Sequence, residues 1–145
     1  MSYENGYNPM RWDCQRQGCF NIKKRPKIEQ LAEALPGRIS FTDVDGIVEV
    51  GGNLLLVEWK NHQALPVGQR ILFERMTEFC PATVLIVEGD AEQMTVSCVR
   101  IAWAGRIAPA VQTDLDGLRR LVREWADWAA AHPVPLQRRE AALHA

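Results

Sequence analysis

The sequence lacks the features of several specialised classes of protein. It has no apolar run approaching the roughly 18 residues of a membrane-spanning helix, so we expect no membrane partner. Residues Met1 to Tyr7 carry no basic flank and no hydrophobic segment, so we expect no signal peptide and a cytoplasmic location. No internal repeat is visible either, and we therefore treat the chain as an ordinary globular sequence.

Cysteine is scarce, since the chain has four and none belongs to a tightly spaced pair. Cys80 and Cys98 lie alone in apolar surroundings, where we expect buried and reduced thiols. A structural Zn²⁺ site usually draws on closely spaced ligands, which this spacing does not provide. Cys14 and Cys19, with His62, are the zinc alternative that the sequence leaves open.

The net charge of −1 excludes electrostatic attraction of the whole protein to nucleic acid. The charge is uneven, however, because residues 11–38 contain seven Lys and Arg against three Asp and Glu. Within this segment, Lys23, Lys24, Arg25 and Lys27 are candidate contacts for phosphate groups. A solvated N-terminal arm is the alternative interpretation.

A chain of 145 residues with 47% apolar and 24% charged residues suits one globular domain. We expect an arm at 1–25, a single domain at 26–131 and a tail at 132–145. The patterns predict a helix at 26–34, strands at about 39–43, 44–50 and 54–60, a helix at about 67–79, a buried strand at 83–88, a strand at 94–103 and a helix at 115–131. This order predicts an α/β fold, a three-layer-like sandwich in which helices flank a central mixed β-sheet.

Apolar stripes predict which sides of the two longer helices face the core. The expected inward residues are Ile71, Leu72, Met76 and Phe79 in the first helix, and Leu118, Leu121, Val122, Trp125 and Trp128 in the second. Trp125 and Trp128 also fit an interface, which would make the C-terminal helix an assembly surface.

Two predicted strands meet at a Gly51-Gly52-Asn53 turn, which is typical of a hairpin. Side chains alternate across a strand, so Glu58 and Lys60 point the same way, beside the partner strand that holds Asp45. Ionised carboxylates at the edge of a core are costly unless a cation compensates them. Asp45 and Glu58 therefore favour a divalent metal, and Lys60 is placed to assist hydrolysis by water.

With this spacing, the sequence resembles the PD-(D/E)XK nuclease superfamily, in which Asp45, Glu58 and Lys60 would be the signature residues. It is most similar to small virus-type replication-repair nucleases and to Holliday-junction resolvase-like proteins. Those families continue after the lysine with a loop, a glutamine and a helix, and Gln69 matches that glutamine. The resemblance covers residues 26–90 and implies a restriction endonuclease-like fold.

The resemblance also implies the roles of individual residues. Asp45, Glu58 and the backbone carbonyl of Trp59 would bind Mg²⁺ or Mn²⁺, with Glu29 from the first helix as a further ligand. Lys60 would position the attacking water and stabilise the developing negative charge. Gln69 would orient Lys60 or contact a phosphate. His62 would contact phosphate.

Two positions leave the assignment of the first ligand open. Asp43 competes with Asp45 because both have the same strand parity, and Val44 stands where the family usually has a proline. The glycine after Asp45 and its distance from Glu58 favour Asp45. Glu49 shares this parity but lies near the turn, so we expect it to face solvent.

The resemblance implies a metal-dependent endonuclease that hydrolyses phosphodiester bonds in DNA, with RNA not excluded. It would act in replication, repair or recombination of a phage or mobile element, in the cytoplasm of a bacterial or phage-infected host. A chain of this size would act as a homodimer or higher homo-oligomer. The alternative is a catalytically silent protein of the same fold that binds DNA or inhibits a partner protein.

Overall fold

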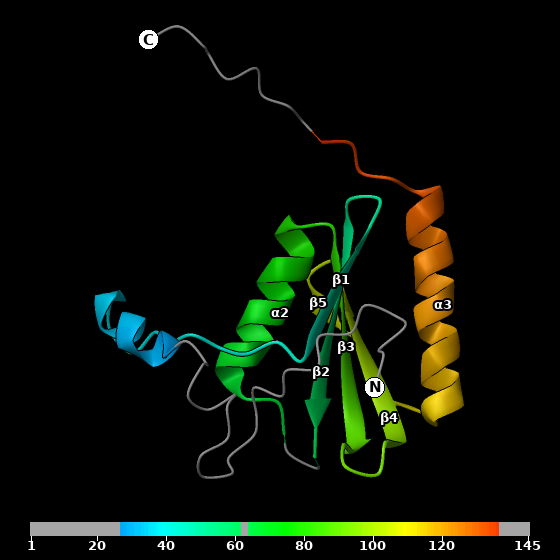
Figure 1. Ribbon diagram of the computed structural model, residues 1–145, viewed down its shortest axis with the longest axis horizontal. Helices are drawn as coiled ribbons and strands as arrows, with labels where there is room; N and C mark the ends of the chain where they lie inside the picture. The colour runs from blue at the N-terminus through cyan, green and yellow to red at the C-terminus, as the bar shows by residue number, and fades with distance from the viewer. Residues whose placement is uncertain (1–26, 62–63, 137–145) are drawn as a thin grey trace, which may run out of the picture. The chain divides into compact units, whose positions relative to one another are not determined.

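The computed structural model describes residues 27–61 and 64–136 of the chain. The chain forms two compact units, Met1–Thr42 and Asp43–Ala145. In the described part of the first unit, a 3₁₀ helix, η1, spans Ile28–Ala34 (Figure 1). The prediction of a regular helix from residue 26 was therefore wrong in type. Lys27 at the N-cap makes no side-chain capping hydrogen bond, and a segment of seven residues is too short to stabilise an α-helix by itself.

The strand predicted at about 39–43 is absent. These residues are exposed and irregular, and Ile39 and Phe41 are 59% and 51% exposed. The ladder of the following hairpin begins only at Gly46, so the segment has no strand with which to pair. An apolar sequence without a pairing partner does not form a strand, because its backbone hydrogen bonds would stay unmade.

The second unit has an α/β fold built on an open, mixed sheet (Figure 1). Six strands and two α-helices are described in it: β1 (Gly46–Val50), β2 (Asn53–Lys60), α2 (Val67–Phe79), β3 (Ala82–Asp90), β4 (Thr95–Trp103), β5 (Arg106–Ile107), β6 (Val111–Gln112) and α3 (Leu115–Ala131). The sheet order is β1-β2-β3-β4-β5, and β6 pairs with β4. Strands β2 and β3 are parallel and joined through α2, whereas the other pairs are antiparallel. The coarse prediction of helices flanking a mixed sheet is confirmed.

Each face of the sheet carries its own hydrophobic core, and each core is covered by one helix (Figure 1). Leu56, Val84 and Ile86 pack with Phe73 of α2 on one face. Leu55 and Leu85 pack with α3 on the other. Residues 82–87 of β3 are all buried, as predicted for a strand covered on both sides. Alternate residues of β2 and β3 therefore belong to opposite faces.

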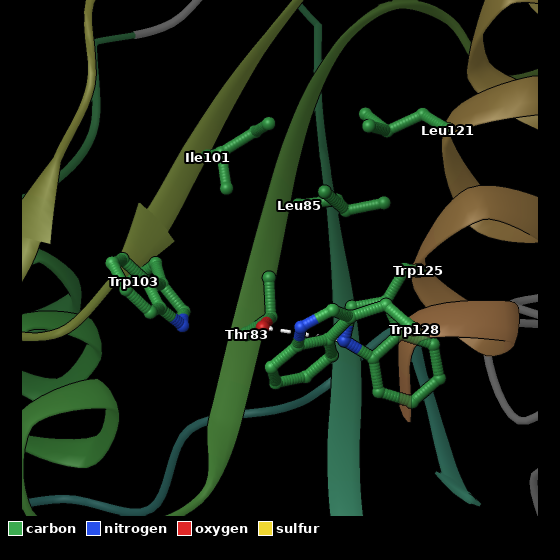
Figure 2. A pocket seen from close by; sticks show the side chains of 7 residues that line it. All are labelled: Thr83, Leu85, Ile101, Trp103, Leu121, Trp125 and Trp128. Carbon is green, nitrogen blue, oxygen red and sulfur yellow. Dashed lines mark hydrogen bonds between the residues drawn. The ribbon is translucent and has the colours of Figure 1, made fainter. Parts of the chain in front are cut away.

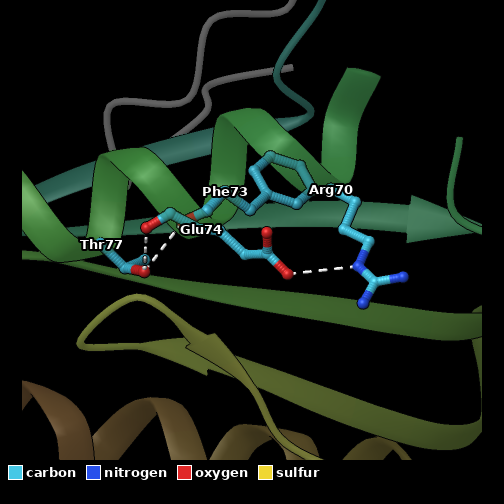
Figure 3. A network of polar contacts seen from close by, with 4 residues as sticks. All are labelled: Arg70, Phe73, Glu74 and Thr77. Atoms are coloured by element: carbon cyan, nitrogen blue, oxygen red, sulfur yellow. Dashed lines mark hydrogen bonds and ion pairs between the residues drawn. The ribbon is translucent and has the colours of Figure 1, made fainter. Parts of the chain in front are cut away.

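The face of α2 that enters the core agrees with the prediction only in part. Leu72 and Met76 pack against the core as predicted, and Phe73 and Thr77 are buried. Ile71 and Phe79 are instead 44% and 78% exposed. Thr77 fits the core because its hydroxyl donates to the Phe73 carbonyl at 2.8 Å (Figure 3). The same oxygen accepts the Gly105 N–H at 3.1 Å, which links α2 to the β4–β5 turn. On its outer side, Arg70 pairs with Glu74 at 3.2 Å (Figure 3).

Helix α3 begins and ends where the sequence predicted. Asp114 caps it, since its side chain accepts the Gly117 N–H at 2.8 Å. The inward stripe is mostly correct, because Leu118 and Trp125 are 8% exposed and Leu121 and Val122 pack against the core. Trp128 is the exception at 42% exposed, and it stacks on His132 instead.

The C-terminal end of α3 is tied to the β1–β2 hairpin. Asn53 is 3% exposed and donates from Nδ2 to the His132 carbonyl at 2.9 Å and the Ala129 carbonyl at 3.4 Å. The Val134 N–H donates to the Gly51 carbonyl at 2.7 Å. Asn53 thereby satisfies carbonyls that a helix end leaves without intrahelical partners. The sequence indicated only a turn at this place.

A search of the described residues finds no helix with both the length and the apolar character needed to cross a bilayer.

Candidate active site

Glu58 and Lys60 lie at the carboxyl end of β2, on the face of the sheet that α2 covers. Glu58 is 7% exposed, and its Oε1 lies 3.0 Å from Lys60 Nζ. Gln69 of α2 donates from Nε2 to the same oxygen at 2.9 Å. A buried carboxylate requires compensation of this kind. Both contacts use Oε1, which leaves Oε2 available for another ligand.

The N-terminus of α2 adds positive potential beside this pair. Gln69 is the third residue of the helix, so the N–H groups of the first turn lie close to Glu58. Pro66 at the N-cap makes no side-chain capping bond, and the first turn holds no acidic residue. Uncapped N–H groups and the helix dipole favour an anion at such a place.

Gln69 also carries an unmet hydrogen-bond acceptor. Its Oε1 is buried and has no hydrogen-bond partner, the one such side-chain atom in the part of the chain that the structure describes. Nearly all buried polar atoms in folded proteins have a partner, which is often an ordered water. This oxygen therefore marks a position beside Glu58 where a water or a substrate donor would be stabilised.

Asp45 reaches this site from the start of the hairpin. It directly precedes β1 and is exposed, and its Oδ2 accepts the Trp59 N–H at 2.6 Å. Gly46 pairs with Val57, so Trp59 lies two residues beyond the β1 ladder. The N–H and C=O of one strand residue point to the same edge, and the Trp59 carbonyl therefore faces the side on which Asp45 lies.

The neighbouring acidic residues differ from Asp45 in their contacts. Asp43 is exposed and makes no hydrogen bond or ion pair with any residue in the described ranges. Glu49 is exposed, as the sequence predicted, and accepts the Gly52 N–H inside the turn. Trp59 packs against the opposite core and donates from Nε1 to the Gly89 carbonyl at 3.0 Å. Of the three acidic side chains, only that of Asp45 hydrogen-bonds to a residue of β2.

The donor set is compatible with a hard divalent cation. Asp45, Glu58 and the Trp59 carbonyl would supply two carboxylates and one carbonyl, and Mg²⁺ typically binds few carboxylates and retains several waters. The orphaned Gln69 Oε1 provides an acceptor for such a water. Among the described residues, no three Asp, Glu, His or Cys side chains group closely enough to hold a metal ion, so a closed zinc site has no support there.

Several predicted site residues fall outside the described residues or outside this cluster. Lys23, Lys24, Arg25, His62, Cys14 and Cys19 lie outside the described ranges. Lys27 and the 3₁₀ helix η1, which contains Glu29, belong to the first unit. Lys27 is exposed, and the Glu29 side chain is not described. Of the two described thiols, Cys80 is exposed and Cys98 half-buried. The prediction of a buried Cys80 was wrong because it directly follows α2, at the surface.

Strands β3 and β4 extend the polar face beyond β2. Lys60 pairs in register with Glu88, and Glu88 with Cys98, so the three share one face. The Cys98 thiol donates to Glu88 Oε2 at 3.4 Å. Burial raises the pKa of this thiol, and the hydrogen bond and negative charge of Glu88 add to the effect. Arg100 lies on the same face, and the sequence pattern had not indicated these residues because only the register brings them beside Lys60.

The opposite face of the sheet has an apolar groove of about 270 Å³ between α3 and strands β3 and β4 (Figure 2). Ile101 and Leu121 line it, and Trp103 and Trp128 flank it at 60% and 42% exposure. Trp125 closes its base, with Nε1 3.3 Å from Thr83 Oγ1 (Figure 2). We refer to this feature as the α3 groove.

A scan against protein-family models and searches of curated proteins and of solved structures found no match to this chain.

Proposed function

We propose that the protein is a metal-dependent nuclease that hydrolyses phosphodiester bonds, with a restriction endonuclease-like fold. The observation that carries this proposal is the buried Glu58 carboxylate, held by Lys60 and Gln69 through one oxygen, beside an Asp45 fastened to the next backbone N–H. Buried charged groups that converge beyond the carboxyl end of a strand are typical of functional sites in α/β proteins. The sequence resemblance to PD-(D/E)XK nucleases assigns chemistry to these same residues.

Each residue has a role that its contacts support. Asp45, Glu58 Oε2 and the Trp59 carbonyl would hold Mg²⁺ or Mn²⁺, which when bound supplies Lewis acidity at the phosphate. Lys60 presents an ammonium group next to the water that attacks, and it stabilises the negative charge that develops on the phosphoryl oxygens. Gln69 holds Glu58 in place and presents its free Oε1 to that water. The α2 N-terminus stabilises the anionic substrate.

DNA is the substrate we propose, with RNA as the alternative, and the setting that the resemblance implies is a phage or mobile element in a bacterial host. Glu29 and His62 would extend the metal site and the phosphate contacts. Residues Lys23, Lys24, Arg25 and Lys27 would bind the substrate backbone. These roles rest on the sequence pattern alone, because the contacts described for the candidate site involve only residues of the second unit.

One contact favours a second candidate, a protein that binds DNA or a partner without catalysis. Lys60 and Glu58 neutralise each other at 3.0 Å, as they would in a site that serves stability alone. In an active enzyme the cation must draw Glu58 toward its own charge and free the Lys60 ammonium. Metal binding therefore discriminates between the two candidates.

We further propose a homodimer formed through the α3 groove. One side of α3 carries Arg120, Leu121, Glu124 and Trp128, because helix residues three and four positions apart lie on the same side. Arg120 and Glu124 are exposed and form no ion pair with each other. In a two-fold pair of antiparallel α3 helices, each Arg120 would meet the partner's Glu124, and Trp128 would enter the apolar groove.

The decisive experiment measures cleavage of supercoiled plasmid, single-stranded circles and branched junctions with Mg²⁺ or Mn²⁺. Lys60→Ala should abolish cleavage while leaving the fold intact, and Asp45→Asn should abolish Mn²⁺ binding in calorimetry. Glu92→Gln, at an exposed position in the β3–β4 turn, is the matched control and should change neither. Binding of nucleic acid without metal binding or cleavage would favour the silent binding protein. Absence of both metal binding and cleavage would overturn the nuclease proposal.

A further inference from the structure

Strand register, rather than proximity in the sequence, places one arginine beside the candidate site. Glu58 of β2 pairs with Ile86 of β3, and Ile86 pairs with Arg100 of β4. Residues paired in register point to the same face, so Glu58 and Arg100 both lie on the face that α2 covers. Adjacent strands are about 4.8 Å apart, and the two backbones are therefore separated by about 10 Å.

Arg100 has no charged partner among the residues that the structure describes. The residue is half-buried, yet its guanidinium makes no hydrogen bond or ion pair with any described residue. By contrast, the exposed Arg70 and Arg119 pair with Glu74 and Asp116 at 3.2 and 3.1 Å. Burial of unpaired donors costs free energy, and arginine carries five of them. Within the described residues, the structure thus maintains a partly desolvated cation without a counter-ion.

The described residues around Arg100 do not supply that counter-ion. Glu88 lies on the same face, one register pair away from Arg100 on that face, and its Oε2 accepts the hydrogen bond of Cys98 instead. Arg100 lies close enough to Cys98 to oppose the rise in the pKa of that thiol, but it forms no ion pair with Glu88. Its donors therefore remain available to an external anion.

We propose that Arg100 binds a backbone phosphate next to the one that is positioned at Glu58 and Lys60. This inference rests on the nuclease proposal, because it takes the occupant of the site to be a nucleic acid strand. Phosphates of one strand follow each other at roughly 3.4 Å along the helix axis, so a neighbouring phosphate falls within the span from Glu58 to Arg100. The planar guanidinium binds a phosphate through two parallel hydrogen bonds, which a lysine cannot reproduce.

The experiment compares wild type, Arg100→Gln and Arg100→Lys in binding of a fluorescein-labelled 20-nucleotide strand and its duplex, titrated with NaCl. Loss of a charged hydrogen-bonded contact should weaken affinity by about 10-fold or more. Loss of one phosphate contact should also reduce the salt slope by about 0.9 for duplex or about 0.7 for single strand. Arg100→Lys should keep the slope and lose affinity, since it retains the charge without the planar fork.

Arg123→Gln is the matched control, because it removes the same charge from an exposed position on α3. It should leave affinity and slope unchanged. Cleavage by wild type together with unaltered binding by Arg100→Gln would overturn the Arg100 inference and leave the nuclease proposal standing. Failure of the wild type both to bind either probe and to cleave would remove the nuclease proposal itself. If Arg100→Gln proves unfolded by circular dichroism, Arg100→Lys decides, and wild-type affinity in that variant contradicts the inference.

Discussion

At the scale of single residues, Glu58 is the side chain whose burial requires compensation by neighbouring donors. Its carboxylate is buried and depends on Lys60 and Gln69 for compensation. Lys60→Met should therefore lower the free energy of unfolding by about 1–3 kcal/mol, because the carboxylate keeps a single donor. Urea denaturation at pH 7 measures this change.

The matched double variant Glu58→Gln/Lys60→Met removes the charge together with its partner and should recover part of the loss. Equal stability of wild type and Lys60→Met would show that the ion pair contributes nothing and that Glu58 is solvated.

The thiol of Cys98 allows a pH-dependent test of the polar face that β3 and β4 add beside Lys60. Burial and the acceptor Glu88 raise its pKa, so the folded protein keeps this proton at a pH where the unfolded chain has lost it. Stability should therefore fall as pH rises above the ordinary thiol pKa, and Cys98→Ser should lack this component. Below that pKa both states hold the proton and no difference is expected.

Labelling with iodoacetamide, followed by peptide mass spectrometry, measures the same shift directly. The midpoint of the pH profile of Cys98 in the folded protein should lie above that of the same thiol in the unfolded chain. Coincident midpoints would contradict the expected influence of Glu88.

At the scale of elements, the β3–β4 connection depends on one glycine. A Cβ on Gly89 would lie 2.0 Å from the Thr95 carbonyl oxygen, at the point where the register between the strands shifts. Gly89→Ala should destabilise the protein by roughly 1–3 kcal/mol through steric conflict. Gly68→Ala, in the first turn of α2 with nothing within 4 Å, should instead be neutral or stabilising by up to about 1 kcal/mol. Thermal melting of both variants checks the contrast, and similar melting temperatures would contradict it.

The elements also show how far sequence reasoning reaches. Helix α3 was predicted to the residue because Asp114 marks its start and a clear apolar stripe fixes its period. The helix predicted at 26–34 is present over 28–34 with 3₁₀ geometry, and the strand predicted at 39–43 is absent, because local pattern does not reveal whether a cap or a partner strand exists. The shared face of Glu58 and Lys60 was predicted from strand alternation, whereas Gln69 was assigned only through the family resemblance. Arg100 was not predicted, because its proximity to Glu58 depends on pairing across two neighbouring strands.

At the scale of the whole molecule, the proposed dimer makes a prediction about mass in solution. Wild type should have the mass of a dimer in light scattering coupled to size exclusion, because the α3 groove and its exposed tryptophans would be buried. Trp128→Ser should yield monomer, whereas Trp125→Ala would damage the core and is unsuitable.

The charge pairing gives a sharper version of this test. Arg120→Glu should weaken the dimer by placing like charges together, and Arg120→Glu/Glu124→Arg should restore it. A wild type that remains monomeric at high concentration would remove the proposed interface.

The tie between Asn53 and the end of α3 has a consequence for the order of events during synthesis. Asn53 joins residues 76 and 79 positions later in the chain, so the hairpin that carries both candidate carboxylates is secured late. Contacts of such long sequence separation form slowly, because the intervening chain must lose conformational entropy before the contact can stabilise it. A nascent chain on the ribosome thus lacks this anchorage until residues 129–134 have emerged from the exit tunnel. Translation itself therefore delays completion of the candidate site.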